Sequence, residues 1–197
     1  MKQQFSKDDI LAAGFGIVRD EGYEAVTMRR VAEAAGSSVQ PLYSMFGDRE
    51  AFMEALYRHA VEWVRGYNTE HSDAGCTAFS SVGVAHIRIA QEYPGVFAFV
   101  HMSPYVQARN MEDLLSLAEQ PGVLSAMVEA WGISEENARM LYANMAIYTH
   151  GLSALIMAGA AFSDEELGAT MNGAFSALAS QAGVDIAQFA EGRGHEA

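Results

Sequence analysis

Hydrophobic positions along most of this chain recur every three or four residues, which is the spacing of an amphipathic helix. The first such stretch covers about residues 7–21, with Ser6 placed to cap it and Gly22 placed to end it. A longer stretch covers about residues 49–68. No alternating run of polar and apolar residues is long enough to indicate a β-sheet. The pattern therefore predicts an all-α protein.

Two short helical pieces lie between these stretches, in the segment TMRRVAEAAGSSVQPLYSMFGDREAF (residues 27–52). Thr27 can cap the first piece, and Gly36 suits the left-handed residue that ends such a helix. Ser37 or Ser38 can cap the second piece, which is very short and polar. Two helices joined by a short glycine turn form a helix-turn-helix, whose second helix enters the major groove of DNA.

This segment resembles the TetR family of transcriptional regulators. The positions that match the family pattern are Thr27, Val31, Ala32, Ala35, Gly36, Ser38, Leu42, Tyr43, Phe46 and Arg49. Ser37, Gln40 and Met45 depart from its commonest form. Because Ser37 and Gln40 lie where bases would be read, their departure concerns the operator sequence rather than the family. The resemblance implies a three-helix DNA-binding head and a larger helical body that binds an effector and forms a dimer.

The DNA-binding candidates follow from the same segment. The residues expected to hold phosphates are Thr27, Arg29, Tyr43 and Arg49, and those expected to face base edges are Ser37, Ser38 and Gln40, with Arg30 or Ser44 as further candidates. Gln40 can make a bidentate contact to adenine, worth about 1–3 kcal/mol of discrimination. The alternative for Tyr43 is a packing aromatic.

The distribution of charge limits how such a head would bind DNA. The formal net charge is −13, but residues 1–67 hold eight Lys and Arg against ten Asp and Glu, a charge of −2. Residues 68–197 hold four against fifteen, a charge of −11. The head therefore has no basic surface overall, and we expect modest non-specific affinity with a shallow salt dependence.

Beyond residue 75 the pattern predicts further helices, and the resemblance divides the chain by function. The helices are expected at about residues 76–93, 95–102, 106–119, 123–131, 135–159 and 164–182, with Ser134 and Ser163 placed to cap the last two. The division is a DNA-binding domain at 1–50, a connecting helix and loop at 51–75, an effector-binding and dimerisation domain at 76–185, and a tail at 186–197. The last two helices carry small and apolar residues around most of their circumference, which indicates burial on several sides. A second copy of the chain would supply the outer cover in a homodimer; the alternative is ordinary packing within one subunit.

Aromatic, methionine and histidine side chains are dense in the middle of the chain. The candidates for an effector pocket are His86, Phe97, His101, Met102, Tyr105, Met127, Trp131, Tyr142, Met145 and Tyr148. An apolar pocket with a few polar tips is what small-molecule recognition needs, although a helical core with hydrogen-bonded Tyr and His has the same composition. The stretches EYPGVFAFVHM (92–102) and YTHGLSALIMAG (148–159) also resemble the TetR subgroup with a His-Gly pair, here His150-Gly151. That resemblance implies an apolar or amphipathic effector.

Other chemistry finds little support in the sequence. The six histidines form no i, i+4 pair, Cys76 is the sole cysteine, and no nucleotide-binding or nucleophile motif occurs. We therefore expect no metal, no cofactor and no enzyme activity. The first residues, MKQQFSKDD, lack a signal core, and the longest apolar stretch, 151–162, is too short to span a bilayer, which predicts a cytoplasmic protein. The rival function is a helical ligand-binding or protein-interaction module of the same fold that does not bind DNA.

Overall fold

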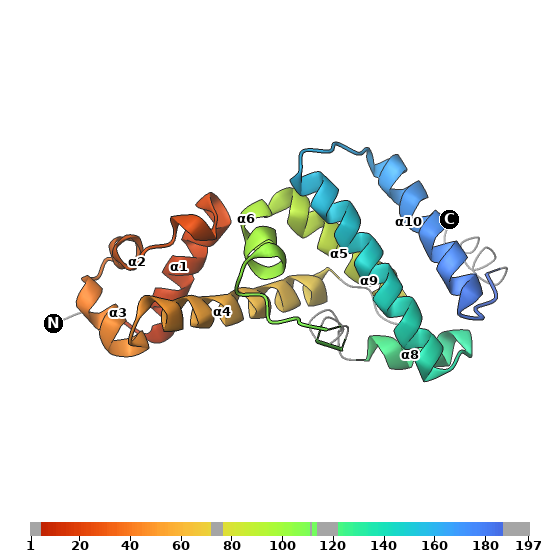
Figure 1. Cartoon of the computed structure of the whole chain (residues 1–197), viewed down its shortest axis with the longest axis horizontal. Coiled ribbons are helices and arrows are strands. Elements are labelled where there is room, and N and C mark those ends of the chain that lie inside the picture. Colours follow the sequence, from red (N-terminus) through yellow and green to blue (C-terminus); the bar gives the residue numbers. More distant parts are fainter. Residues whose placement is uncertain (1–4, 72–76, 111, 114–121, 187–197) are drawn as a thin grey trace. The chain divides into compact units, whose positions relative to one another are not determined.

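The computed structural model describes residues 5–71, 77–110, 112–113 and 122–186, and helices are the regular elements of this part of the chain (Figure 1). In order they are α1 (Lys7–Glu21), η1 (Tyr23–Ala25), α2 (Met28–Ala34), α3 (Val39–Phe46), α4 (Arg49–Glu70), α5 (Thr77–Glu92), α6 (Pro94–Phe97), η2 (Ala98–Met102), α8 (Val123–Trp131), α9 (Glu135–Met157) and α10 (Asp164–Gln181). The predicted all-α class is confirmed. None of the described helices combines the length and apolarity needed to cross a bilayer.

Serine side chains cap three of the helices at their N-termini, as the sequence predicts. The Ser6 hydroxyl accepts a hydrogen bond from the Asp9 backbone N–H at 3.1 Å, and the Asp9 carboxylate accepts one from the Ser6 N–H at 2.9 Å. These two bonds satisfy backbone donors that a helix start leaves open, and the bonds to Ser6 lower the pKa of Asp9. Ser163 caps α10 in the same manner, and Ser134 caps α9.

The chain forms two compact units. The first contains residues 1–67 together with 88–107, and the second contains residues 68–87 together with 108–197. The first unit therefore joins the three N-terminal helices and most of α4 to α6 and η2, which come much later in the sequence. How the units share the predicted functions stays a prediction.

The core of the first unit comes from one face of each long helix. Ile10 and Val18 of α1, Leu42 of α3, and Phe52 and Leu56 of α4 are all fully buried. Their spacing along α1 and α4 is the three-or-four repeat that predicts those helices. This packing holds α3 against α1 and α4, and so positions the second helix of the helix-turn-helix.

The middle of the chain departs from the predicted helices in two places. The predicted helix 95–102 is the short helix α6 followed by the π-helix η2. The predicted helix 106–119 is wrong at its start, because residues 106–110 are not helical. The Asn110 side chain accepts a hydrogen bond from the Asp113 N–H at 2.9 Å, so helical structure begins only after Asn110. Residues 111 and 114–119 of that prediction lie outside the described residues.

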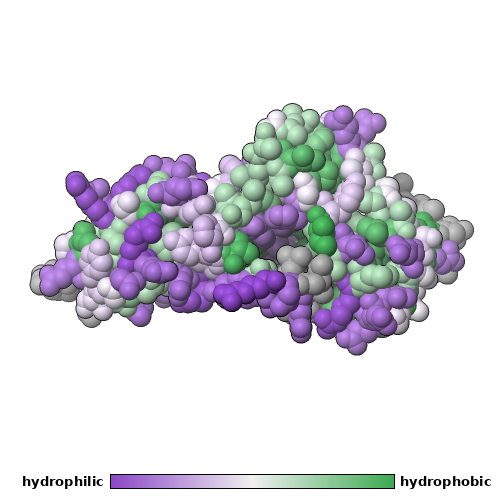
Figure 2. Space-filling model, viewed as in Figure 1, coloured by the Kyte–Doolittle hydropathy of each residue, from purple (hydrophilic) through white to green (hydrophobic). Residues whose placement is uncertain are grey.

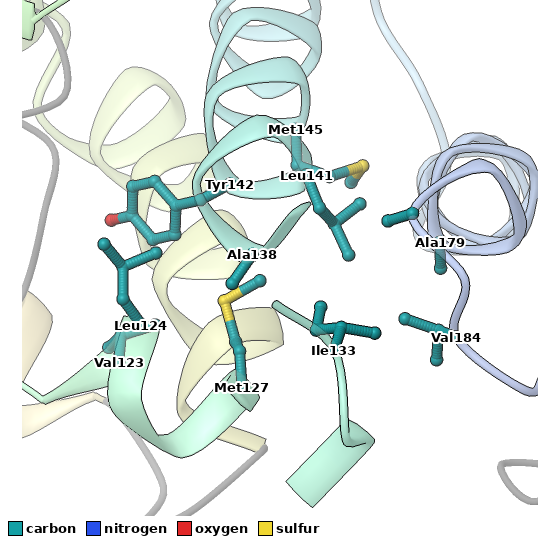
Figure 3. Packing of buried hydrophobic residues seen from close by; sticks show 11 residues of the cluster. Val123, Leu124, Met127, Ile133, Ala138, Leu141, Tyr142, Met145, Ala179 and Val184 are labelled. Atoms are coloured by element: carbon teal, nitrogen blue, oxygen red, sulfur yellow. The ribbon is translucent and has the colours of Figure 1, made fainter. Parts of the chain in front are cut away.

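The second unit has its own hydrophobic core, made by α8, α9 and α10. Met127 of α8, Leu141 of α9 and Ala179 of α10 are almost completely buried in it. Figure 3 shows the Leu141 side chain directed toward α10 and the Tyr142 ring lying beside Leu124 of α8. Ala179 is the small residue through which α10 contributes to this core, whereas Ala169, Gly173 and Ala177 of α10 are exposed.

Candidate nucleic-acid interface

The turn between α2 and α3 requires a glycine at position 36. Gly36 has φ +68°, in the left-handed region that side chains rarely adopt. The Gly36 N–H donates to the Glu33 carbonyl at 3.1 Å, and the Ser37 N–H donates to the Ala32 carbonyl at 2.8 Å. These two bonds end α2 and set the direction in which α3 leaves. The helix-turn-helix predicted from the sequence is therefore present.

The helix α3 buries one side and exposes the other. On the buried side, the Leu42 side chain packs into the core of the first unit. On the other side, Ser38, Gln40, Tyr43 and Ser44 are exposed, and Ser37 is half-buried. Tyr43 is 48% exposed, so its ring is accessible to an outside partner. The exposed side is polar, uncharged and rich in hydrogen-bonding groups, which suits reading of base edges.

The predicted serine cap of α3 is not formed. Ser38 occupies the N-cap position, but its side chain makes no capping hydrogen bond. The Ser37 hydroxyl donates instead to the Ser38 carbonyl at 3.1 Å. The α3 helix therefore begins without a side-chain acceptor for its first N–H groups, which leaves them to an acceptor from outside.

Thr27 caps α2 and is exposed. Its hydroxyl oxygen accepts a hydrogen bond from the Arg30 backbone N–H at 3.2 Å, as the sequence predicts. The hydroxyl hydrogen is still able to donate, because a threonine hydroxyl has one donor in addition to its acceptor sites. Thr27 can thus orient α2 and contact a phosphate at the same time.

The two arginines of α2 differ in their surroundings. Arg29 is 84% exposed, and its guanidinium pairs with Glu33 at 2.9 Å on the same helix. Water screens such a pair, so a phosphate can compete for Arg29. Arg30 forms an ion pair with Glu21 of α1 and donates to the Ala25 carbonyl at 3.3 Å. These contacts tie α2 to the end of α1, and the base contact expected of Arg30 stays a prediction.

Arg49 opens α4 on the exposed surface. Asp48 precedes it and accepts a hydrogen bond from the Ala51 N–H at 2.8 Å, which caps α4. Glu50 follows in the same turn. Arg49 is thus exposed at a helix N-terminus, where backbone N–H groups also favour a phosphate, but with acidic neighbours on both sides.

A further cation that the sequence pattern did not single out lies close to α3. The Lys7 ammonium stands 5.5 Å from the centre of the Phe46 ring, at the end of α3. Lys7 and Arg58 also line an open depression of about 490 Å³ between the start of α1, the end of α3 and α4. The place of Lys7 beside α3 depends on the packing of α1 against α4, so no local sequence signal reveals it.

The predicted effector residues divide between the two compact units. The first unit contains Phe97, His101, Met102 and Tyr105. Phe97 is fully buried, and its ring centre lies 4.8 Å from that of His101, whereas Met102 is 54% exposed. Tyr105 packs edge-on against Phe99, with 5.8 Å between ring centres. These four residues therefore belong to one short stretch at α6 and η2.

The second unit contains the other six predicted effector residues, His86, Met127, Trp131, Tyr142, Met145 and Tyr148. Met127, Tyr142 and Met145 are members of the packed core, and Trp131 packs against it. The ring of His86 lies 5.8 Å from that of His150, and burial lowers the pKa of His86 to about 4, with a smaller effect from His150. Near pH 7 both rings are therefore neutral, since burial also lowers the pKa of His150.

Comparison with known proteins gives one family match and a set of similar folds. Residues 10–56 match the model of bacterial regulatory proteins of the tetR family. No curated protein sequence matches the chain significantly. The family match covers the segment that contains α2, α3 and the start of α4.

Three solved structures illustrate the likeness of fold, and each belongs to a protein assigned to the TetR family of transcriptional regulators. One from Vibrio parahaemolyticus has a TM-score of 0.63 at 15% identity and covers 86% of this chain and 96% of that chain. One from Rhodococcus sp. has a TM-score of 0.64 at 21% identity, covering 87% and 97%. One from Marinobacter aquaeolei VT8 has a TM-score of 0.57 at 22% identity, covering 87% and 94%. At these identities the likeness is one of fold.

Proposed function

The chain is a transcriptional regulator of the TetR family, and we propose that it is a dimeric repressor released from a palindromic operator by a small apolar effector. The observation that best supports operator binding is the polar, exposed side of α3, the helix that follows the Gly36 turn. A helix of this kind, held from below by Leu42, fits the major groove. A regulator acts where the chromosome lies, so a cytoplasmic location is part of the proposal.

Each candidate residue takes a role according to its surroundings. Gln40 faces an adenine edge, with Ser37, Ser38 and Ser44 as its neighbours on the reading side. The phosphate contacts come from Thr27, Arg29, Tyr43 and Arg49. The bonds of Arg30 to Glu21 and Ala25 support a role in positioning α2, in addition to the base contact for which Arg30 stays a candidate.

The dimer would form on the exposed side of α9 together with α10. Four large hydrophobic side chains on α9 are exposed, namely Met140, Ile147, Tyr148 and Leu155. Figure 2 shows hydrophobic surface over the C-terminal end of α9 and the loop that follows it. The side chains recur at helical spacing, so they line one stripe that a second copy can cover. A two-fold axis there would present two α3 helices to two half-sites of one operator.

The effector would bind among the aromatic and methionine side chains of the body. Isolated arginines and a net acidic charge in residues 68–197 disfavour a polyphosphate and suit a neutral or cationic apolar compound. Binding would favour an arrangement in which the two heads no longer match the operator spacing. The helix α4 is the proposed connection, because its residues divide between the two compact units.

A selection from random DNA with the purified full-length protein tests the DNA-binding part. We expect an enriched two-fold symmetric sequence, and Gln40→Ala should relax the preference at one base pair per half-site, by about 1–3 kcal/mol. Gln91→Ala, an exposed glutamine on α5, is the matched control and should leave the preference unchanged. If Gln40→Ala weakened all sequences equally, the reading role would be wrong. Failure to enrich any sequence would favour the module that does not bind DNA.

Dimer formation and effector response need separate measurements. Leu155→Glu places a charge in the proposed interface and should shift the protein from dimer to monomer in analytical ultracentrifugation, while an already exposed Glu136→Gln should not. If the effector lowers the affinity of the protein for the operator, the operator must lower the affinity of the protein for the effector by the same factor. Titrations without that reciprocity would contradict direct coupling.

A further inference from the structure

The segment 94–105 folds into the same compact unit as the DNA-binding helices and touches them through backbone atoms. A Cβ atom on Gly95 of α6 would lie 2.2 Å from the Val18 carbonyl oxygen of α1 and 3.4 Å from Gly22 Cα. Only a glycine allows this approach. The start of α6 is therefore in direct contact with the end of α1, just before η1.

Ser103 locks the π-helix η2 that follows α6. Its hydroxyl donates to the Phe99 carbonyl at 2.6 Å and accepts from the Tyr105 N–H at 3.2 Å. Ser103 is only 6% exposed, so water does not compete for these bonds. A π-helix is a rare, less favourable turn that is often found at functional sites. The Ser103 side chain is thus hydrogen-bonded both to the Phe99 carbonyl and to the Tyr105 backbone N–H, and it fixes the path of the chain between these two residues.

The two residues that Ser103 sets in place pack on the DNA-binding helices. Phe99 stacks on Tyr23 of η1 with 5.5 Å between ring centres, and packs edge-on against Tyr57 of α4 at 5.7 Å. Tyr105 packs edge-on against Tyr23 at 6.5 Å. The Tyr57 hydroxyl donates to the Val100 carbonyl at 3.2 Å. Tyr23 therefore contacts the rings of both residues whose backbone is hydrogen-bonded to Ser103.

Tyr23 in turn leads to α2. It begins η1, the short turn that ends at Ala25 and precedes the Thr27 cap. The Ala25 carbonyl accepts a hydrogen bond from the Arg30 guanidinium, which also pairs with Glu21. Tyr23 and the carbonyl that accepts from Arg30 therefore belong to the same three-residue helix. These contacts thus connect Ser103 to α2 without passing along α4.

We infer that Ser103 is a positioning residue for DNA recognition, acting through Phe99, Tyr23 and Arg30 on α2. The two hydrogen bonds of Ser103 keep the π-helix in the form that packs on Tyr23, and so favour the position of α2 that the operator requires. This inference rests on the proposed DNA-binding function and adds a second connection to the one along α4.

Operator binding by the full-length protein, measured by fluorescence anisotropy, tests the inference with matched variants. Ser103→Ala removes both hydrogen bonds and should weaken operator binding about tenfold, a typical coupling between sites. Ser153→Ala is the control: Ser153 is fully buried on α9 of the other unit and donates to the Thr149 carbonyl at 3.0 Å, a bond of the same kind. It should leave operator affinity unchanged. Tyr23→Leu keeps apolar bulk but removes the stack on Phe99, and should reproduce the effect of Ser103→Ala.

Two further readouts separate positioning from a general loss of structure. Binding to a random-sequence duplex should change less than operator binding, since non-specific contacts tolerate a displaced α2. The combined Ser103→Ala and Arg30→Gln variant should lose less affinity than the sum of the two single losses, because both act on one series of contacts. Full operator affinity in both Ser103→Ala and Tyr23→Leu would overturn the inference while leaving the regulator function intact. A wild-type protein that binds no operator would instead refute the function on which the inference depends.

Discussion

Replacing Gly95 by alanine tests how closely α6 approaches α1. The added Cβ would lie 2.2 Å from the Val18 carbonyl oxygen and 3.3 Å from that of Arg19. Carbon and oxygen in close contact lie about 3.3 Å apart, so the two backbones must separate by about 1 Å. Both atoms belong to backbone, and neither can turn aside as the end of a side chain does.

The expected cost follows from overpacking. Inserting a methyl group into a packed site costs typically about 1–3 kcal/mol, and here the clash is with backbone. Alanine recovers up to about 1 kcal/mol of helix propensity, but Gly95 is only the second residue of a four-residue helix, so most of that gain is absent. We expect a net loss of about 2 kcal/mol, which for a chain of this size lowers the melting temperature by about 4–8 °C.

Thermal unfolding followed by circular dichroism at the helical band measures this change. Gly66→Ala is the matched control, because Gly66 lies inside α4 and its added Cβ meets nothing within 4 Å beyond its chain neighbours and its own helix backbone. That variant should be stabilised by about 0.5–1 kcal/mol, since alanine loses less backbone entropy in a helix. If Gly95→Ala melted at or above the wild-type temperature, α6 would not pack on α1 as described.

Three other predictions follow from the local structure. Thr27→Ala removes the cap of α2 and should cost about 1 kcal/mol in urea unfolding, whereas Thr27→Ser should be nearly neutral; equal stability of all three proteins would argue against the cap. His86 has a folded-state pKa of about 4, below its ordinary value of 6.5, so on acidification the unfolded chain takes up a proton at this residue before the folded protein does. The free energy of unfolding should keep this contribution above about pH 6.5 and lose up to about 3 kcal/mol as the pH drops to about 4. A His86→Gln variant with an equally steep loss would contradict this assignment. Operator affinity should fall only moderately with salt: the logarithm of the binding constant against the logarithm of the salt concentration should have a slope of roughly −4, for about two phosphate contacts by arginine per protomer. A slope of about −10 would show that more cationic side chains contact phosphates than Arg29 and Arg49.

Much of the helical architecture is predictable from the sequence, because its causes are local. The caps at Ser6, Ser134 and Ser163 depend on contacts between residues three apart, and each is confirmed by its hydrogen bond. The turn at Gly36 depends on the left-handed backbone conformation that glycine adopts without strain, and its positive φ confirms it. Where a local rule competes with another, the prediction is weaker: the expected cap of α3 is absent because the Ser37 hydroxyl bonds to the neighbouring carbonyl.

The candidate DNA-binding residues are predictable as a set but not in their individual surroundings. Sequence spacing places Arg29 and Arg30 side by side on α2. The tertiary structure distinguishes them, since Arg30 reaches Glu21 and the Ala25 carbonyl while Arg29 stays on its own helix. Whether each residue contacts DNA stays a prediction for the variants above.

The sequence by itself determined the all-α class, most helix limits, and the turn that makes a DNA-reading helix of α3. Each of these rests on a residue and its neighbours within one or two helical turns. Only the tertiary structure decided that residues 88–107 pack with the N-terminal helices, that Gly95 meets Val18, and that Lys7 lies over Phe46. Those contacts join residues far apart in the chain, and their existence depends on the summed packing of whole helices, which no local pattern records.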